Sequence, residues 1–417
     1  MPTPSSPTRT GAHSYITRDA VFLAVLAAAF TSVCCWLLSE HRGGVGAQDF
    51  RGFYAAGETV IHSPSHLFEG RLQKQLQDAA AGGDQLVTYE HPAYEALLYA
   101  LLSGFHYQTA YRVYAVWNMA LLWLCFLVSP PAVSRFMAAW RPALFFLSLP
   151  ILLAIFVGQD SILLLLAVCL TYRALSNSND RLAGVILGLA TFKPAIVVPL
   201  ALLLSIRRGR RFAGAFLGVA LACGALSVGI TGLRSTGEFL HLLATATLSD
   251  DHSVSAQFNH GIWLHAMPNV DGLLYLLGSG HLSVRLFNGL NITATLALLG
   301  ACAWLLRRSI SDSTAFAVAL LGAVLASPHV YIYDLSLLPI AFLLLSGRWI
   351  RMVAILWFLL PPVLYACSFP YLMWFAPAGI VPVLLLAICF GEALKAEANQ
   401  HSLLQSRRHT GRASVAP

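Results

Sequence analysis

Long apolar runs separated by short polar turns dominate this sequence. The first run, residues 19–38, has about 20 residues, the length that an α-helix needs to cross a bilayer. Further spans are predicted at residues 108–129, 142–157, 161–175, 182–192, 195–206, 212–231, 284–306, 313–327, 332–346, 350–367 and 372–391. The pattern predicts an all-α polytopic membrane protein with about 12 transmembrane or half-membrane helices and external juxtamembrane helices.

Three stretches do not fit a simple crossing. The apolar patch at residues 91–103 has about 13 residues, which is short for a crossing and typical of a re-entrant segment. The run over residues 182–206 contains Pro194, which removes a backbone donor, so we expect two short helices; one kinked helix is the alternative. Residues 66–81 have the pattern of an amphipathic helix that lies along the membrane surface.

The arginines predict which side of the membrane each turn faces, because cytoplasmic turns are enriched in Lys and Arg. If residues 91–103 do not cross, the arginine-bearing turns fall on one side, whereas a full crossing would place Arg135 and Arg141 outside. We therefore expect cytoplasmic arginine turns and an external site. The expected parts are a disordered cytoplasmic tail at 1–18, one membrane domain at 19–391 with external loops at 39–90 and 232–283, and a cytoplasmic tail at 392–417.

The composition excludes several classes of protein. The chain is 57% hydrophobic and 11% charged, whereas about a quarter of a soluble protein is charged. The net charge of +7 resides in arginine clusters between apolar runs, so it does not indicate nucleic-acid binding. All eight cysteines fall inside apolar runs without a CxxC pair, which argues against a disulfide framework or a zinc site.

Five polar clusters are expected to converge on the external face, where polar groups near hydrocarbon usually mark a functional cavity. They lie at residues 49–54, 89–92, 158–161, 192–194 and 327–334. Asp49, which follows the first span, is a candidate general base, and a solvated loop acid is the alternative.

Lys193 lies in an apolar run with no carboxylate close to it in sequence, so we expect an anion such as a phosphate beside it. Other residues of the clusters have two interpretations each. Asp160 and Asp334 would belong to the site or cap the helices that follow them. His329 would bind a phosphate or be a structural histidine, and Arg51 would share the site or point away from it.

The order of these motifs resembles glycosyltransferase family 87. It runs from Asp49-Phe50-x-x-Phe53-Tyr54-Ala55-Ala56-Gly57 through Tyr89-x-x-Pro92, Gly158-Gln159, Ala183-Gly184 with Gly188, and Lys193-Pro194 to Ser327-Pro328-His329-x-x-x-Tyr333-Asp334. The resemblance covers nearly all of the chain from residue 19 to about residue 390. It implies a GT-C-like membrane enzyme, similar to bacterial mannosyl- and arabinosyltransferases that use polyprenyl-phosphate-linked sugars.

The resemblance also implies roles for single residues. Asp49 is expected to be the catalytic base of an inverting transfer. The resemblance places Lys193 and His329 in the donor-phosphate region, and we expect Arg51, Gln159 and Tyr333 on the same donor side. Family members often have a doubled proline with a preceding tyrosine where this chain has Tyr89-Glu90-His91-Pro92. Glu90 and His91, together with Tyr54, are therefore expected on the acceptor side.

The expected reaction moves a hexose or pentose, mannose foremost, from a polyprenyl-phosphate donor to a lipid or glycan acceptor at the periplasmic face of a bacterial inner membrane. The expected partners are membrane lipids, the polyprenyl-phosphate-linked sugar and a glycolipid or glycan acceptor, but no nucleic acid. No cofactor, metal ligand or essential metal is expected, because electrostatic stabilisation of the leaving phosphate can replace a metal.

The competing interpretation is a transporter or flippase of a lipid-linked sugar or another anionic lipid. Such a protein would also place cations and broken helices around a membrane cavity. The polar clusters gather on one face and no inverted repeat is evident in the sequence. Both features favour the transferase.

Overall fold

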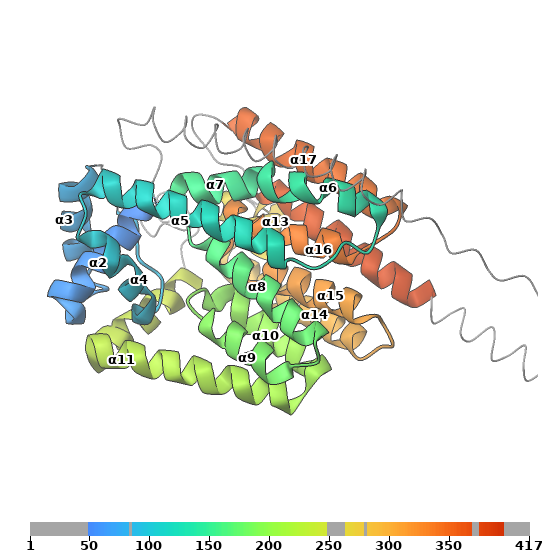
Figure 1. Cartoon of the computed structure of the whole chain (residues 1–417), viewed down its shortest axis with the longest axis horizontal. Coiled ribbons are helices and arrows are strands. Elements are labelled where there is room, and N and C mark those ends of the chain that lie inside the picture. The colour runs from blue at the N-terminus through green and yellow to red at the C-terminus, as the bar shows by residue number, and fades with distance from the viewer. Residues whose placement is uncertain (1–48, 83–85, 248–262, 279–281, 369–374, 396–417) are drawn as a thin grey trace, which may run out of the picture.

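The computed structural model describes residues 49–82, 86–247, 263–278, 282–368 and 375–395. Every regular element among these residues is a helix (Figure 1). The α-helices are α2 Phe50–His62, α3 Gly70–Ala81, α4 Ala93–Ser103, α5 Tyr107–Val128, α6 Arg135–Phe146, α7 Leu149–Val157, α8 Ser161–Ser176, α9 Asp180–Leu189, α10 Pro194–Arg208, α11 Arg210–Thr247, α13 Val270–Gly278, α14 Val284–Leu306, α15 Asp312–Ala326, α16 Leu338–Leu344, α17 Arg348–Ser368 and an unlabelled helix that covers the described residues 380–395. Short 3-10 helices are η1 Pro64–His66, η2 Leu264–Ala266, η3 Ile332–Leu337 and η4 Ala376–Gly379.

Six helical segments of the described residues are long and apolar enough to cross a membrane. They are Tyr107–Val128, Arg135–Val157, Arg210–Ala244, Val284–Leu306, Arg348–Cys367 and Ala376–Lys395. The chain is therefore a multi-pass membrane protein. The expected count of about 12 spans is not confirmed for this part of the chain. The predicted first span at 19–38 and the predicted tail at 1–18 lie outside the described residues.

Several predicted spans are short helices. α8, α10 and α15 have 15 or 16 residues each, which corresponds to about 22–24 Å and is less than the hydrocarbon core of a bilayer. α15 is buried from Ala315 to Ala326, so protein and not lipid surrounds it. α15 and most of α8 thus lie in the interior of the molecule, whereas α10 leaves one face exposed at Val198 and Leu202.

Some predicted boundaries differ from the structure. The span predicted at 212–231 agrees with the first part of α11, whose helical geometry is interrupted at Gly232, with a φ of 81° and a ψ of 166°, before a helix continues to Thr247. The span predicted at 142–157 begins earlier, at Arg135, and a turn at Leu147 and Ser148 divides it into α6 and α7. α2 was not predicted at all, although it buries most of its residues and packs against α4.

Two predictions about short segments agree with the structure. The chain breaks between α9, which ends at Leu189, and α10, which starts at Pro194. Proline suits the first position of a helix because its missing N–H has no intrahelical partner there. The patch at 91–103 forms α4, a helix of 11 residues. α4 is far too short to cross a bilayer at 1.5 Å per residue.

Glycines allow two pairs of helices to cross closely. An added Cβ at Gly57 of α2 would lie 2.5 Å from the carbonyl carbon of Tyr99 in α4. An added Cβ at Gly184 of α9 would lie 2.4 Å from the carbonyl oxygen of Phe212 in α11. Both separations are well below van der Waals contact, so these positions exclude any larger residue.

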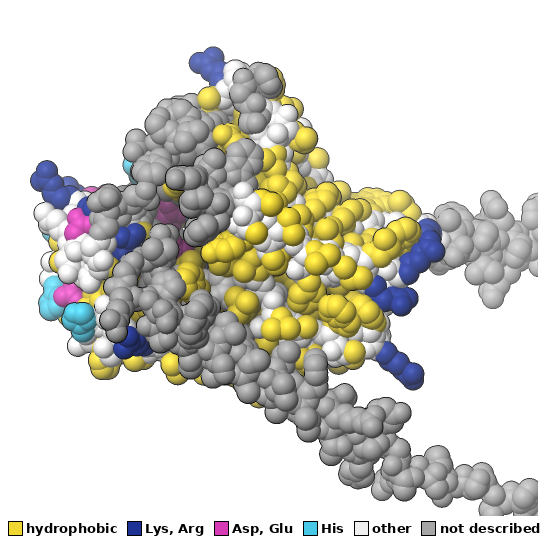
Figure 2. Space-filling model, turned by 90° about the horizontal axis from the view of Figure 1, so that it is seen from above, with side chains coloured by type: hydrophobic (Ala, Val, Ile, Leu, Met, Phe, Trp, Pro, Cys, Tyr) yellow, Lys and Arg dark blue, Asp and Glu magenta, His cyan; other side chains and the backbone are white. Residues whose placement is uncertain are grey.

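The two ends of α8, α10 and α15 differ in the residues that they carry. One end of each carries Asp160, Lys193 or Ser327, and the other end lies toward an arginine-bearing turn. At that far end Arg207 and Arg208 each lie 3.2 Å from Asp312, which joins the turns after α10 and before α15. Figure 2 shows a broad hydrophobic surface between two ends that carry the charged side chains.

The tight contact at Gly184 generates a prediction. Gly184→Ala should lower the apparent melting temperature of the purified protein, because overpacking a close helix crossing costs about 1–3 kcal/mol. Gly214→Ala in α11 is the control, since a Cβ there meets nothing within 4 Å. Fluorescence-detected thermal unfolding of both variants measures the difference. Equal melting temperatures would show that the α9–α11 crossing is not tightly packed.

Candidate active site

The polar turns that were predicted to converge lie where one helix ends and the next begins. Asp49 precedes α2, Asp160 precedes α8 and Lys193 precedes α10. The turn at 89–92 leads into α4, and the turn at 327–331 leads into η3. Hydrogen bonds and ion pairs join residues of all five turns, so the structure brings them together at one site.

A glycine turn allows the start of α2 to approach the end of α7. The N–H of Asp49 donates to the carbonyl of Val157 at 3.2 Å. Gly158 has a φ of 78°, a value that favours glycine, and a Cβ there would lie only 2.6 Å from Cβ of Phe50. Gly158 therefore permits the contact that places Gln159 beside Asp49.

The carboxylate of Asp49 is half-buried and accepts a hydrogen bond from Gln159. Nε2 of Gln159 donates to Oδ2 of Asp49 at 2.8 Å and to the hydroxyl of Tyr333 at 3.2 Å. Burial raises the pKa of Asp49, and the Gln159 hydrogen bond and the charges of Lys193 and Arg51 lower it only in part. A carboxylate with a raised pKa is a stronger base than an ordinary aspartate. Asp49 can therefore accept a proton from a hydroxyl that reaches it.

Lys193 lies at the centre of the site and binds two carboxylates. Its ammonium lies 2.6 Å from Asp334 Oδ1 and 2.9 Å from Asp160 Oδ1, and it donates to Ser161 Oγ at 2.9 Å. A longer contact of 3.5 Å reaches Oε1 of Gln159. Burial opposes the charge of Lys193, yet the two carboxylates raise its pKa above the usual value. Two aspartates from distant turns thus balance the charge of Lys193, and a role of Lys193 toward a phosphate stays a prediction.

Asp160 and Asp334 use their side chains differently. Asp160 precedes α8 but makes no capping hydrogen bond, and its pKa is lowered because Lys193 and His91 outweigh the effect of burial. Asp334 accepts from the backbone N–H of Tyr331 and from Ser161 Oγ, so it caps η3 and also binds Lys193. The capping interpretation is therefore wrong for Asp160 and incomplete for Asp334.

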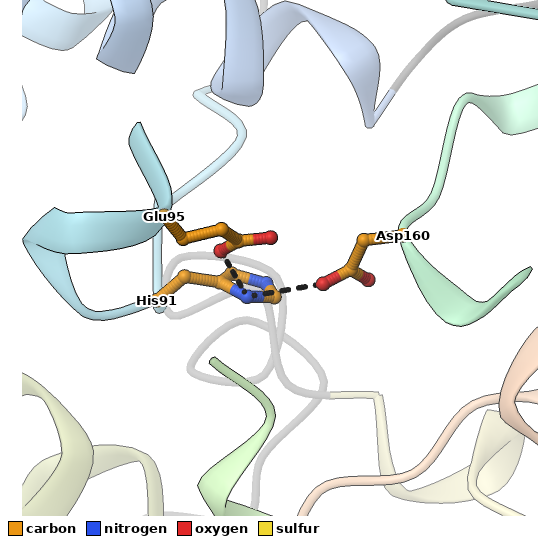
Figure 3. Close-up of side chains that lie close together, drawn as sticks. All are labelled: His91, Glu95 and Asp160. Atoms are coloured by element: carbon orange, nitrogen blue, oxygen red, sulfur yellow. Dashed lines mark ion pairs between the residues drawn. The ribbon is translucent and has the colours of Figure 1, made fainter. Parts of the chain in front are cut away.

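His91 lies between two buried acids (Figure 3). Its Nδ1 is 2.9 Å from Oε2 of Glu95 and 3.4 Å from Oδ2 of Asp160. Burial opposes protonation of His91, but these carboxylates raise its pKa to about 9. Glu95 was not identified from the sequence, although an acid in an apolar segment, four residues after a histidine, was a usable signal.

Glu90 and His329 join the turn at 89–92 to the turn at 327–334. Nε2 of His329 lies 3.5 Å from Oε2 of Glu90, and the His329 side chain is 32% exposed. The ring of His329 packs edge-on against Tyr331, which packs against Tyr333. An accessible histidine therefore lies in the same turn as Tyr333, whose hydroxyl accepts a hydrogen bond from Gln159, the partner of Asp49.

Arg51 and Tyr54 lie on α2, and they differ in their relation to the site. Arg51 donates to the carbonyl of Gly82 at 2.8 Å, and its charge is close enough to lower the pKa of Asp49. The hydroxyl of Tyr54 donates to the carbonyl of Phe105 at 3.0 Å, in the turn between α4 and α5. Tyr54 therefore packs the helices, and no hydrogen bond of the described residues connects it to the polar cluster.

The comparison with known proteins gives one family. A sequence model of glycosyltransferase family 87 matches residues 89–328, which is more than half of the 417 residues. The matched part contains four of the five polar turns in whole or in part, including Lys193 and Gln159. No curated protein and no solved structure matches the chain.

The buried ion pairs of Lys193 generate a prediction about stability. Lys193→Met should destabilise the protein by about 3–5 kcal/mol, because it leaves Asp160 and Asp334 without their cation. Lys74→Met is the control, since Lys74 pairs with Asp78 on the surface of α3 and such pairs contribute little. Thermal unfolding in detergent compares the two variants. Equal melting temperatures would mean that Lys193 is not needed to compensate these carboxylates.

The raised pKa of Asp49 generates a prediction about pH. Above this pKa the wild type buries a charge that Asp49→Asn lacks, and the asparagine can still accept from Gln159. The variant should therefore melt about 1–3 °C higher at neutral pH. The difference should shrink as the pH falls through the raised pKa and vanish below 3.8, the usual pKa, because the carboxyl is then protonated in both the folded and the unfolded state. A variant that melts lower at neutral pH would show that ionised Asp49 stabilises the fold.

Proposed function

Since the chain belongs to glycosyltransferase family 87, we propose that it transfers a hexose or pentose, mannose foremost, from a polyprenyl-phosphate donor to a hydroxyl of a lipid or glycan acceptor. The family and the membrane-spanning helices make the chain a multi-pass membrane glycosyltransferase. The observation that carries the proposal is the half-buried Asp49 carboxylate, whose pKa is raised and whose Oδ2 is held by Gln159. A base in this setting suits the activation of a hydroxyl.

In the proposed reaction the acceptor hydroxyl gives its proton to Asp49. Its oxygen attacks the anomeric carbon from the face opposite the phosphate, and the bond between that carbon and the phosphate oxygen breaks. The electron pair of that bond leaves with the phosphate. A single displacement of this kind inverts the anomeric configuration and needs one base and one stabilised leaving group.

The leaving phosphate would gain charge, and cationic side chains near Asp49 are suited to bind it. We assign this role to Arg51, whose charge acts on Asp49, and to His329, whose side chain is accessible. Lys193 supports the site by holding Asp160 and Asp334, the sequence neighbours of Gln159 and Tyr333. No metal at the phosphate is required by this scheme.

The proposed location is the periplasmic face of a bacterial inner membrane. α10 supports it, since Lys193 precedes its first residue and Arg207 and Arg208 end it about 20 Å away. If the arginine-bearing end faces the cytoplasm, the site faces the other side. Glu90, which lies 3.5 Å from His329, and its neighbour His91 would then line the approach of the acceptor.

The test is donor consumption by the purified protein. Wild type and Asp49→Asn are incubated with radiolabelled polyprenyl-phosphate sugars and a membrane lipid extract, and donor loss and product are followed. Wild type should consume one donor, and Asp49→Asn should be about 10²–10⁴-fold slower, the usual contribution of a general base. Asp78→Asn, a surface substitution on α3, is the control and should retain full activity.

Two outcomes would contradict the proposal. Asp49→Asn that transfers sugar at the wild-type rate would remove Asp49 as the base. A protein that binds a lipid-linked sugar but consumes none in detergent, where no compartments exist, would favour the transporter interpretation.

A further inference from the structure

The cluster of His91, Glu95 and Asp160 has the arrangement of a metal site (Figure 3). One ligand atom from each residue lies within 4.8 Å of the others. The carboxylates of Glu95 and Asp160 are fully buried. None of these three residues is needed as a base or phosphate ligand in the proposed transfer, so their convergence requires another explanation.

The separations suit a small divalent cation. Donor atoms bound to such an ion at about 2.0–2.2 Å lie about 3.0–3.5 Å from one another. Nδ1 of His91 lies 2.9 Å from Glu95 and 3.4 Å from Asp160. His91 precedes Pro92, the extended residue before α4, and Glu95 lies in the first turn of α4, so the turn into the helix brings the two side chains together.

His91 and Asp160 are poorly satisfied by hydrogen bonds within the protein. Nδ1 of His91 and both carboxylate oxygens of Asp160 are buried without a hydrogen bond of acceptable geometry, although they lie within ion-pair distance of charged neighbours. A proton on Nδ1 points in one direction and can serve one carboxylate well. A metal ion at the same place would bind all three residues at once.

Lys193 does not occupy this place. It contacts Asp160 through Oδ1, whereas His91 faces Oδ2, so an ammonium and an ion would use different oxygens of one carboxylate. Asp49, Glu95, Asp160 and Asp334 together bring more negative charge to the site than Lys193 balances. This excess of negative charge would favour a cation in that position.

Neighbouring side chains hold Glu95 and His91 in place, as the residues around the direct ligands of a metal usually do. Tyr89 and Tyr99 donate to the two oxygens of Glu95, each at 3.4 Å. The imidazole of His91 packs against the rings of Phe53 and Tyr89, with centroids 5.0 and 5.5 Å away. These contacts fix the orientation of Glu95 and His91.

We propose that His91, Glu95 and Asp160 bind a divalent transition-metal ion, of the class of Zn²⁺ or Mn²⁺, which fixes the start of α4 to the start of α8. Mixed imidazole and carboxylate ligands suit this class of ion. The ion replaces the proton on Nδ1 of His91 and has no contact with Asp49. Its role is to position the turn that contains Gln159, and the site therefore goes beyond the proposed transfer.

The experiment measures metal in the full-length protein, purified in detergent through an affinity tag that contains no histidine. Elemental analysis by mass spectrometry should find about one ion per chain. Chelation should lower the melting temperature, and added Zn²⁺ or Mn²⁺, but not Mg²⁺ at the same concentration, should restore it. X-ray absorption at the metal edge should show a first shell of one nitrogen with oxygens.

Variants then assign the ion to the cluster. His91→Ala and Glu95→Gln should each reduce the metal content at least about tenfold. His66→Ala and Glu69→Gln are matched controls, because His66 and Glu69 have the same 2.9 Å separation but lie exposed, and these variants should keep the ion. Asp49→Asn should also keep the ion, so failure of the metal site and failure of the proposed base are distinguishable.

Three results would overturn the proposal. One is a protein with less than about 0.1 ion per chain that no added metal stabilises, in which case a proton occupies the cluster. Another is a metal content that His91→Ala and Glu95→Gln leave unchanged, which would mark an adventitious ion only. If these variants do not fold, X-ray absorption of the wild-type protein decides. A metal whose first coordination shell lacks nitrogen would exclude His91 as a ligand.

Discussion

The ion pairs of Lys193 with Asp160 and Asp334 are the interaction on which the site depends. Each of the three residues lies at the start of a helix, so the pairs fix α8, α10 and η3 relative to one another. Gln159 and Tyr333 are the sequence neighbours of the two aspartates, and Gln159 binds both Asp49 and Tyr333. Buried charges tolerate no loss of a partner, because an unpaired ion in a low dielectric costs several kcal/mol. The ion pairs therefore hold the group that orients the proposed base.

Local features of the sequence predicted much of this arrangement. Apolar length and arginine position placed the polar turns on one side, and Pro194 predicted the break between α9 and α10. The sequence predicted that the turns of Asp49 and Gln159 converge, but the hydrogen bond between these two side chains is known only from the structure. Each of these features acts within a few residues, since a helix end or a membrane boundary is encoded where it occurs.

Long-range partners could not be predicted in the same way. Asp160 has the sequence pattern of a helix cap, and only the packing of α8 against its neighbours reveals that it binds Lys193. α2 was overlooked because its polar flanks resemble a loop, whereas its buried glycine contact with α4 depends on tertiary structure. The expected number of spans is not confirmed in the described residues, because short apolar helices such as α15 are enclosed by protein, and hydropathy does not distinguish a protein interior from lipid.

The most direct test of the role of Asp49 is the pH dependence of the transfer rate in wild type and in Gln159→Leu. Asp49 must be ionised to act as a base, so the wild-type rate should fall as the pH drops through its raised pKa. The Gln159 hydrogen bond lowers that pKa, so its removal should move the fall in rate to higher pH. An acid limb at the same pH in both proteins would contradict the assignment of Asp49 as a base held by Gln159.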